Sequence, residues 1–173
     1  MLFLHNDRKL TEKQLEQEKQ QSLMNLIAFR CGYYRHNIHR FCKDYLGINL
    51  KLFQKVLLWA MNEYDAFFFI AARSIGKTYL VALYSICRAI CYPRSKIICC
   101  SYTFKQGKEI ILKITDDFMQ HSPLLRSEIA KVSVGQNDCA VYFKNGSWMR
   151  VVVAGESARG ARSNILINNC LYI

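Results

Sequence analysis

The sequence predicts an α/β fold in which a parallel sheet is flanked by helices. Two continuous apolar runs, 66–70 and 95–101, are typical of strands that are covered on both faces. Helical patterns at 77–91 and 104–118 alternate with these runs. Because strand, helix, strand, helix is the order of a parallel sheet with crossover helices, we expect one such unit between residues 66 and 118.

Helices are also predicted ahead of the first apolar run. Residues 8–30 read as a polar helix that becomes apolar toward its end, and Gly32-Tyr33-Tyr34 is expected to break it. A second helix is expected over 36–46, with Gly47 just after its end, where glycine is favoured. The apolar spacing of 50–59 predicts a third, amphipathic helix.

The pattern changes after Pro123, where short strands replace the alternation of strands and helices. Asn145-Gly146 is a strong signal for a tight hairpin turn between two of them. The expected strands are 132–134, 139–143, 148–153 and 165–167.

The clearest functional signal is Ala71-Ala72-Arg73-Ser74-Ile75-Gly76-Lys77-Thr78. A helix that starts at Gly-Lys-Thr offers unpaired N–H groups and a positive dipole end to phosphate. Lys77 is expected to reach the β- and γ-phosphates, and the Thr78 hydroxyl is expected to ligate Mg²⁺. Ala71 stands at the first glycine position of this motif. The chain therefore reads as a binder of a nucleoside triphosphate, the alternative being a chance Gly-Lys-Thr ahead of an amphipathic helix.

The formal net charge of +11 favours polyanions as partners, nucleic acid first among them. The alternative is a solvated basic surface without a partner. No stretch reads as a signal peptide or a membrane span. The eight cysteines lack the spacing of a zinc site, and we interpret them as core thiols in a reducing cytoplasm.

Four motifs together give the chain, from about Leu50 onward, a resemblance to the ATPase domain of the terminase large subunit, the viral DNA-packaging motor. They are Phe53-Gln54, the loop 72–78, Cys100-Ser101-Tyr102-Thr103, and Ala158-Arg159-Gly160-Ala161-Arg162-Ser163 ahead of an apolar strand. The resemblance implies a P-loop NTPase fold of the ASCE type, incomplete at its C-terminus, with N-terminal helices and a β-hairpin insertion. It divides the chain into a helical segment, 1–49, and a partial ATPase domain, 50–173.

The resemblance also implies roles for single residues. Gln54 would read the adenine of ATP, and Arg73 would act as an arginine finger supplied in cis. Ala72, Arg73, Ser74, Ile75, Gly76, Lys77 and Thr78 would hold the nucleotide, with Mg²⁺ on Thr78. Arg159 and Arg162 would contact the phosphates of DNA or of the nucleotide. The alternatives are a helix-surface glutamine, a salt-bridged loop arginine and two arginines that merely solvate a turn.

The pattern departs from the family at its Walker B strand, where two carboxylates are needed to hold Mg²⁺ and to activate water. Asn168 and Asn169 stand at these two positions, and amides lack both the negative charge and the basicity. Nucleotide binding is therefore expected, with hydrolysis weak or absent. The family's nuclease domain is also missing from this sequence, so we expect a terminase fragment.

The family implies double-stranded DNA, the portal protein and the small terminase subunit as partners, and oligomers only of the full-length member. It implies the cytoplasm of a host cell, for a viral or prophage-encoded protein. Two alternatives stay open. One is a non-catalytic nucleotide- or DNA-binding regulatory module, and the other is a fragment of a P-loop helicase.

Overall fold

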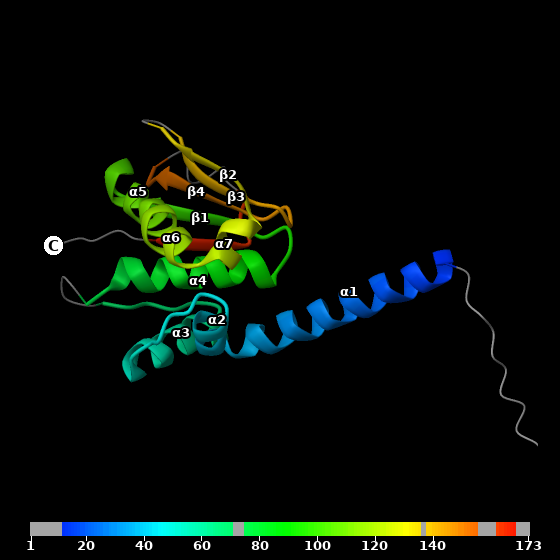
Figure 1. Ribbon diagram of the computed structural model, residues 1–173. Coiled ribbons are helices and arrows are strands. Elements are labelled where there is room, and N and C mark those ends of the chain that lie inside the picture. The colour runs from blue at the N-terminus through cyan, green and yellow to red at the C-terminus, as the bar shows by residue number, and fades with distance from the viewer. Residues whose placement is uncertain (1–11, 71–74, 136–137, 156–161, 169–173) are drawn as a thin grey trace, which may run out of the picture.

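The computed structural model describes residues 12–70, 75–135, 138–155 and 162–168 (Figure 1). The first three described elements are helices, α1 (Glu12–His36), α2 (Ile38–Asp44) and α3 (Leu52–Glu63). The remaining helical elements are α4 (Lys77–Cys91), α5 (Phe104–Leu112), the π-helical η1 (Lys113–Phe118), α6 (Met119–His121) and α7 (Pro123–Glu128). The strands are β1 (Lys96–Ser101), β2 (Ile129–Val134), β3 (Cys139–Phe143), β4 (Trp148–Val153) and β5 (Ile165–Asn168).

The five described strands form one open mixed sheet in the order β2-β3-β4-β1-β5. β1 pairs in parallel with β4 on one side and with β5 on the other. β3 pairs antiparallel with both β2 and β4. The fold is therefore mixed α/β, as expected from the sequence, with a parallel half built on β1 and an antiparallel half that ends at β2.

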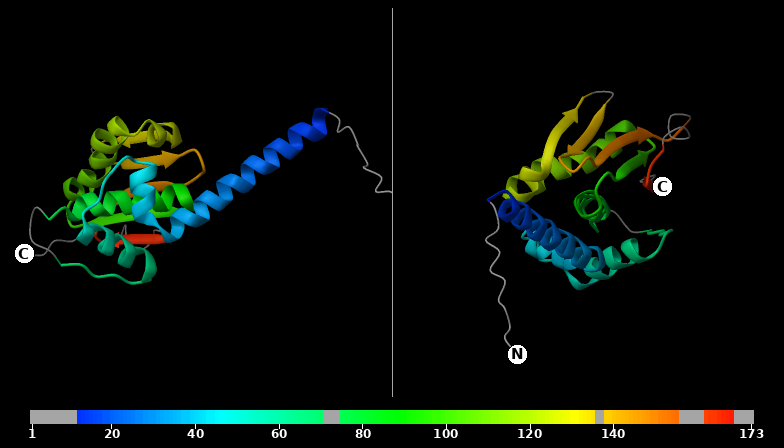
Figure 2. Two further views of the ribbon diagram at one scale, coloured as in Figure 1. Left: turned by 60° about the horizontal axis from the view of Figure 1, so that its bottom comes forward. Right: turned by 90° about the vertical axis from the view of Figure 1, so that its right-hand side faces the viewer.

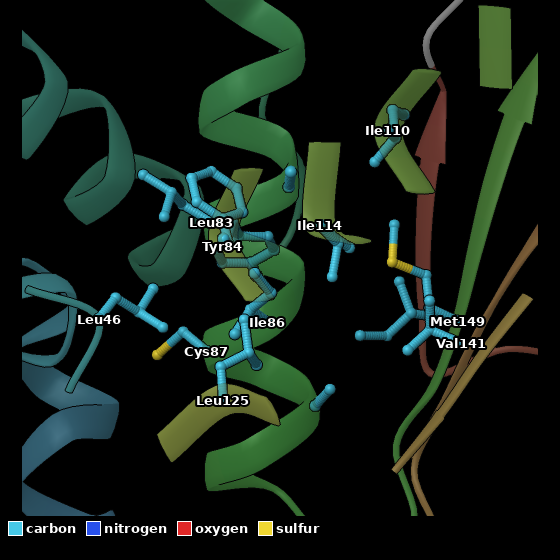
Figure 3. Packing of buried hydrophobic residues seen from close by; sticks show 14 of the residues in the cluster. Leu46, Leu83, Tyr84, Ile86, Cys87, Ile110, Ile114, Leu125, Val141 and Met149 are labelled. Atoms are coloured by element: carbon cyan, nitrogen blue, oxygen red, sulfur yellow. The ribbon is translucent and has the colours of Figure 1, made fainter. Parts of the chain in front are cut away.

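The molecule is layered, with α4 lying between the sheet and the N-terminal helices (Figure 2). The side chains of Ile97, Val141 and Met149 from the sheet share one hydrophobic core with those of α4, α5 and η1. Figure 3 shows this core around Ile114, and it shows Leu46 on the opposite side of α4. Because helix α4 is buried on both sides, its composition is nearly all apolar, as the sequence pattern indicated.

Helix α4 has the bounds predicted for it, and both of its ends are held. At the start, Gly76 is the N-cap with a φ of 89°, a left-handed conformation that glycine adopts without strain. At the end, the side-chain amide of Asn145 donates to the carbonyls of Ala89 (2.7 Å) and Ile90 (3.2 Å). The guanidinium of Arg35 donates to the carbonyl of Cys91. Carbonyls that a helix end leaves without partners are thus satisfied by distant parts of the chain.

The hairpin predicted at Asn145-Gly146 is confirmed. Gly146 has a φ of 83°, and the backbone N–H of Phe143 donates to the carbonyl of Ser147 at 2.9 Å. The Asn145 side chain closes the turn as well, since its oxygen accepts from the N–H of Ser147 at 3.0 Å. One asparagine therefore joins the hairpin to the end of α4.

Helix α5 packs closely on the sheet at Gly107. A Cβ atom built there would lie 2.3 Å from Cγ1 of Val151 and 2.6 Å from Oγ of Ser101. Only glycine fits between the helix and strands β1 and β4 at this point. The contact sets the height of α5 above the parallel half of the sheet.

Two predicted elements are wrong. Residues 66–70 do not join the described sheet, and the side chains of Phe68 and Ile70 are 87% and 80% exposed. Both edges of β1 are already taken by β4 and β5, so the predicted crossover unit from 66–70 to β1 does not form among the described residues. The predicted break at Gly32 is also absent, because α1 continues through it to His36.

Among the described residues, no helix combines the length and the apolar character needed to cross a membrane.

Candidate nucleotide-binding site

The candidate site is centred on the first turn of α4. Gly76 accepts the first helical hydrogen bond, from the N–H of Leu80 at 3.0 Å, so the helix is formed from its first residue onward. Lys77 and Thr78 follow directly, and both side chains are half-buried. The N–H groups of this first turn have no partner within the helix and carry the positive end of its dipole. The turn is therefore suited to an anion.

Tyr79 anchors this turn to the body of the protein. Its ring packs edge-on against Phe118 of η1, with the ring centres 5.1 Å apart. Burial raises the pKa of the Tyr79 hydroxyl, and the neighbouring Cys42 and Asp117 act in the same direction. The packed ring of Tyr79 therefore ties the first turn of α4 to η1.

An apolar hollow of about 720 Å³ lies beside the start of α4. Its walls come from α3 and from the segment that leads toward α4. The lining residues are Leu52, Phe53, Val56, Leu57, Phe69, Ile70 and Ile75. Ile75 is both a wall of the hollow and the neighbour of Gly76, so the hollow and the first turn of α4 are continuous along the chain. All seven lining side chains are apolar, so the hollow offers an apolar surface to a ligand.

Gln54 stands on α3 next to Phe53 of the hollow and is half-buried. Its side-chain oxygen accepts a hydrogen bond from the backbone N–H of Lys51 at 2.8 Å, which is one half of a capping box. A carbonyl oxygen has a second lone pair and the amide has two N–H donors. The residue therefore has a structural function in α3 and retains the chemistry needed to read a base.

The parallel strands end at the same side of the molecule as the start of α4 (Figure 1). Asn168 is the last residue of β5 and pairs with Cys100 near the end of β1. Ligands of open α/β sheets bind outside the carboxyl ends of the strands. Asn168 is thus at the edge expected of a Walker B residue, where it presents an exposed amide in place of a carboxylate.

Arg162 lies away from this edge. It precedes β5 and is exposed, close in sequence to Asn164, whose side-chain oxygen accepts from the N–H of Lys96 at the beginning of β1. Arg162 is therefore at the amino ends of the strands, whereas Asn168 and Gly76 are at the carboxyl ends. Contact of Arg162 with DNA is compatible with this position, and contact with a nucleotide at α4 is disfavoured.

Several predicted site residues lie outside the described residues. They are Ala72, Arg73, Ser74, Arg159 and Asn169, together with Ala71 of the same loop. Of the remaining predicted residues, Gly76, Lys77 and Thr78 form one turn, and Gln54 is on α3 but is not among the residues that line the hollow.

The residues that the structure describes include no group of three or more His, Cys, Asp or Glu side chains arranged to hold a metal ion. Among the described residues of this turn, Thr78 offers a hydroxyl oxygen, and oxygen is the ligand atom that Mg²⁺ prefers.

The sequence pattern did not predict the hollow or the contact of Tyr79 with Phe118. A signal for the hollow was present, since Phe53 and Val56 are apolar residues of α3 that stay exposed. No protein-family model matches the chain, and a search of curated proteins finds no match either.

Proposed function

We propose that the chain is related to the ATPase domain of terminases and that it binds ATP at the first turn of α4. The observation that carries the proposal is the left-handed Gly76, which lets the chain turn into α4 with Lys77 and Thr78 as its first two residues. This turn supplies N–H donors, a cation and a hydroxyl within three consecutive residues. That combination matches the charge and the oxygens of a triphosphate.

The hollow beside the turn supports adenine as the base. The ring of Phe53 and the aliphatic side chains of Leu57 and Ile75 offer an apolar site for a flat ring. Gln54 adds an amide that can both donate and accept at the edge of the base. We infer that Gln54 and Phe53 position the base, and that Lys77 and the helix N-terminus hold the phosphates.

Hydrolysis is proposed to be weak or absent. Asn168 occupies the end of β5 with an amide, which neither neutralises Mg²⁺ nor accepts a proton from water near neutral pH. In the family, binding of Mg²⁺ at this edge stabilises the charge of the transferring phosphoryl group. The chain retains Thr78 as an oxygen ligand for that ion.

Double-stranded DNA is the proposed polymer partner, because the net charge of +11 favours a polyanion. The portal protein and the small terminase subunit are partners implied by the family resemblance alone. A second candidate function, a nucleotide-binding regulatory module without catalysis, is favoured by the amide of Asn168 at the edge where hydrolysis requires a carboxylate.

The proposal is tested by comparing ATP with AMP in titration calorimetry, with Mg²⁺ present. Charge-assisted hydrogen bonds contribute about 1.5–3 kcal/mol each, so ATP should bind roughly ten- to a hundred-fold more tightly than AMP. Equal affinities would mean that the turn at Gly76 makes no phosphate contact. If neither ATP nor AMP binds, the hollow is excluded as the binding site of the base as well.

A further inference from the structure

Two arginines contact the same tyrosine ring where α1 meets the end of α4. The guanidinium carbon of Arg88, on α4, lies 3.9 Å from the centre of the Tyr92 ring, and that of Arg35, on α1, lies 4.4 Å from it. Both distances are within the range in which a cation is attracted to an aromatic ring. The ring thus holds two positive charges near each other, and neither arginine forms an ion pair with a carboxylate of the described residues.

Arg35 and Tyr92 are held in place by further hydrogen bonds. The Nε and Nη2 atoms of Arg35 donate to the carbonyl oxygen of Cys91 at 2.8 and 2.7 Å. The backbone carbonyl of Arg35 accepts from the side-chain amide of Asn62 at 2.8 Å. The carbonyl of Tyr92 accepts from the Ser95 hydroxyl at 2.7 Å. The ring and one of its two cations are therefore fixed by the fold itself.

Arg88 has no such structural function at the end of α4. The carbonyls of residues 89–91 already accept hydrogen bonds from Asn145 and Arg35. The Nε atom of Arg88 is buried and has no hydrogen-bond partner among the described residues. Arg88 as a whole is only half-buried, so its side chain also reaches the surface. Its guanidinium is not needed to cap the helix and is suited to an anion from outside the protein.

Other exposed cations lie at the same end of the molecule. Arg94 follows α4 in the turn to β1, and Lys96 is the first residue of β1. Arg162 precedes β5, whose first residue pairs with Ile97 of β1. Figure 1 shows the end of α4 and the start of β1 on one side of the body. Cations spread over one end of a protein suit a polymer with repeated phosphates better than a single small anion.

We propose that Arg88, with Arg35 and Tyr92 beside it, binds a backbone phosphate of double-stranded DNA. The inference rests on the DNA partner proposed above and assigns a surface to it. Arg88 supplies N–H donors and charge, Tyr92 orients the guanidinium, and Arg35 adds a second charge. Because the contact is with the backbone, it does not distinguish base sequences.

This surface is separate from the candidate ATP site. Helix α4 has 15 residues and is therefore about 22 Å long, with Gly76 at one end and Tyr92 at the other. A phosphate bound at Arg88 is consequently a different group from the phosphates of ATP bound at Lys77. Variants at Arg88 should affect DNA and leave ATP binding unchanged.

The test is the salt dependence of binding to duplex DNA, measured by fluorescence anisotropy. Each phosphate contact contributes about 0.9 to the slope of log affinity against log salt concentration. Arg88→Gln keeps the length of the side chain and removes its charge, so the slope should become shallower by about one unit. Arg88→Lys keeps the charge and should retain the wild-type slope, with a lower affinity because the planar fork is lost.

Two controls make the result specific. Lys105→Gln removes one exposed positive charge from the start of α5, which follows the carboxyl end of β1, and should keep the wild-type slope for DNA. Calorimetry with ATP should give the same affinity for Arg88→Gln as for the wild type. Circular dichroism and unfolding in urea check that each variant is folded.

A wild-type slope in Arg88→Gln overturns the inference, while binding of DNA by the protein then still stands. Equally shallow slopes in Arg88→Gln and Lys105→Gln also overturn it, because total charge would then determine the slope. Weaker ATP binding by Arg88→Gln would assign the arginine to the nucleotide instead. If the wild type does not bind duplex DNA, the proposed DNA partner is wrong, and the assigned surface is wrong with it.

Discussion

The side-chain oxygen of Gln54 accepts a hydrogen bond from the backbone N–H of Lys51 at 2.8 Å. This bond closes the first turn of α3, next to the hollow that we assign to the adenine base. Gln54 is therefore expected to serve the fold through its oxygen and the ligand through its amide N–H groups. Two substitutions separate these functions.

Gln54→Ala removes both functions, and Gln54→Glu removes only the second, because a carboxylate accepts from Lys51 but has no N–H to donate. Loss of an N-terminal cap costs about 0.5–2 kcal/mol. We expect Gln54→Ala to lower the free energy of unfolding in urea by this amount, and Gln54→Glu to leave it nearly unchanged. Both variants should weaken ATP binding in calorimetry. Wild-type affinity in Gln54→Glu would show that the amide does not contact the base.

The contact at Gly107 gives a prediction about stability alone. Gly107→Ala places a methyl group where Val151 and Ser101 leave no space, so α5 must move away from the sheet. Overpacking of this kind typically costs about 1–3 kcal/mol. Gly32→Ala is the matched control, because it also lies in a helix and its Cβ would meet nothing within 4 Å.

Removing backbone freedom at Gly32 should stabilise the protein by up to about 1 kcal/mol. Denaturant unfolding of the two variants measures both effects. If Gly107→Ala leaves the free energy of unfolding unchanged, α5 lies farther from β1 and β4 than the spacing at Gly107 indicates.

The proposed binding of DNA predicts a salt dependence. Affinity for duplex DNA should fall linearly in a plot of log affinity against log salt concentration. Replacing Arg159 and Arg162 by Ala should make the slope shallower by about two units if both contact phosphate. The double variant Lys131→Ala with Lys144→Ala removes the same charge from the antiparallel half of the sheet and should keep the wild-type slope. Fluorescence anisotropy at several salt concentrations gives the slopes. An affinity for DNA that does not change with salt concentration would contradict the proposed binding of DNA.

The amides at the end of β5 give a prediction about turnover. Loss of a general base typically lowers rates about 10²–10⁴-fold. We therefore expect no ATP hydrolysis above background from the wild type in a phosphate-release assay. Asn168→Asp combined with Asn169→Glu should raise Mg²⁺-dependent release.

Asn164→Asp is the control for that variant. It adds a negative charge at the opposite end of β5 and retains the oxygen that accepts from Lys96. Release of phosphate by the wild type at the rate of an active ATPase would contradict the assigned position of Asn168 and direct attention to Glu156, Asp116 and Asp117.

The sequence predicted best the elements whose signals are local. Helix α4 starts at Lys77 and ends at Cys91 as expected, because Gly76 and Pro93 bracket an uninterrupted helical pattern. The hairpin at Asn145-Gly146 follows from the left-handed conformation that Gly146 adopts without strain. Neither feature needs information from elsewhere in the chain.

The wrong predictions concern segments whose structure is determined by contacts with residues far away in the sequence. The apolar run 66–70 indicates a tendency to be buried, yet a strand also needs hydrogen bonds to a sheet, and 66–70 joins neither β1 nor the edge strands β5 and β2 of the described sheet. Gly32 does not end α1, because Tyr34 and Arg35 pack or bond against the rest of the protein and hold the helix beyond it. The hollow beside Ile75 also depends on how α3 lies against the chain before α4, which a sequence pattern does not encode.

The central claim, that Lys77 holds the phosphates of ATP at the start of α4, is tested most directly by titrating wild type and Lys77→Ala with ATP in a calorimeter. Lys131→Ala, an exposed lysine on β2, controls for the loss of one positive charge. Loss of a charge-assisted contact of about 1.5–3 kcal/mol should weaken ATP binding roughly ten- to a hundred-fold in Lys77→Ala and leave Lys131→Ala like the wild type. Equal affinity of all three proteins for ATP would contradict the claim.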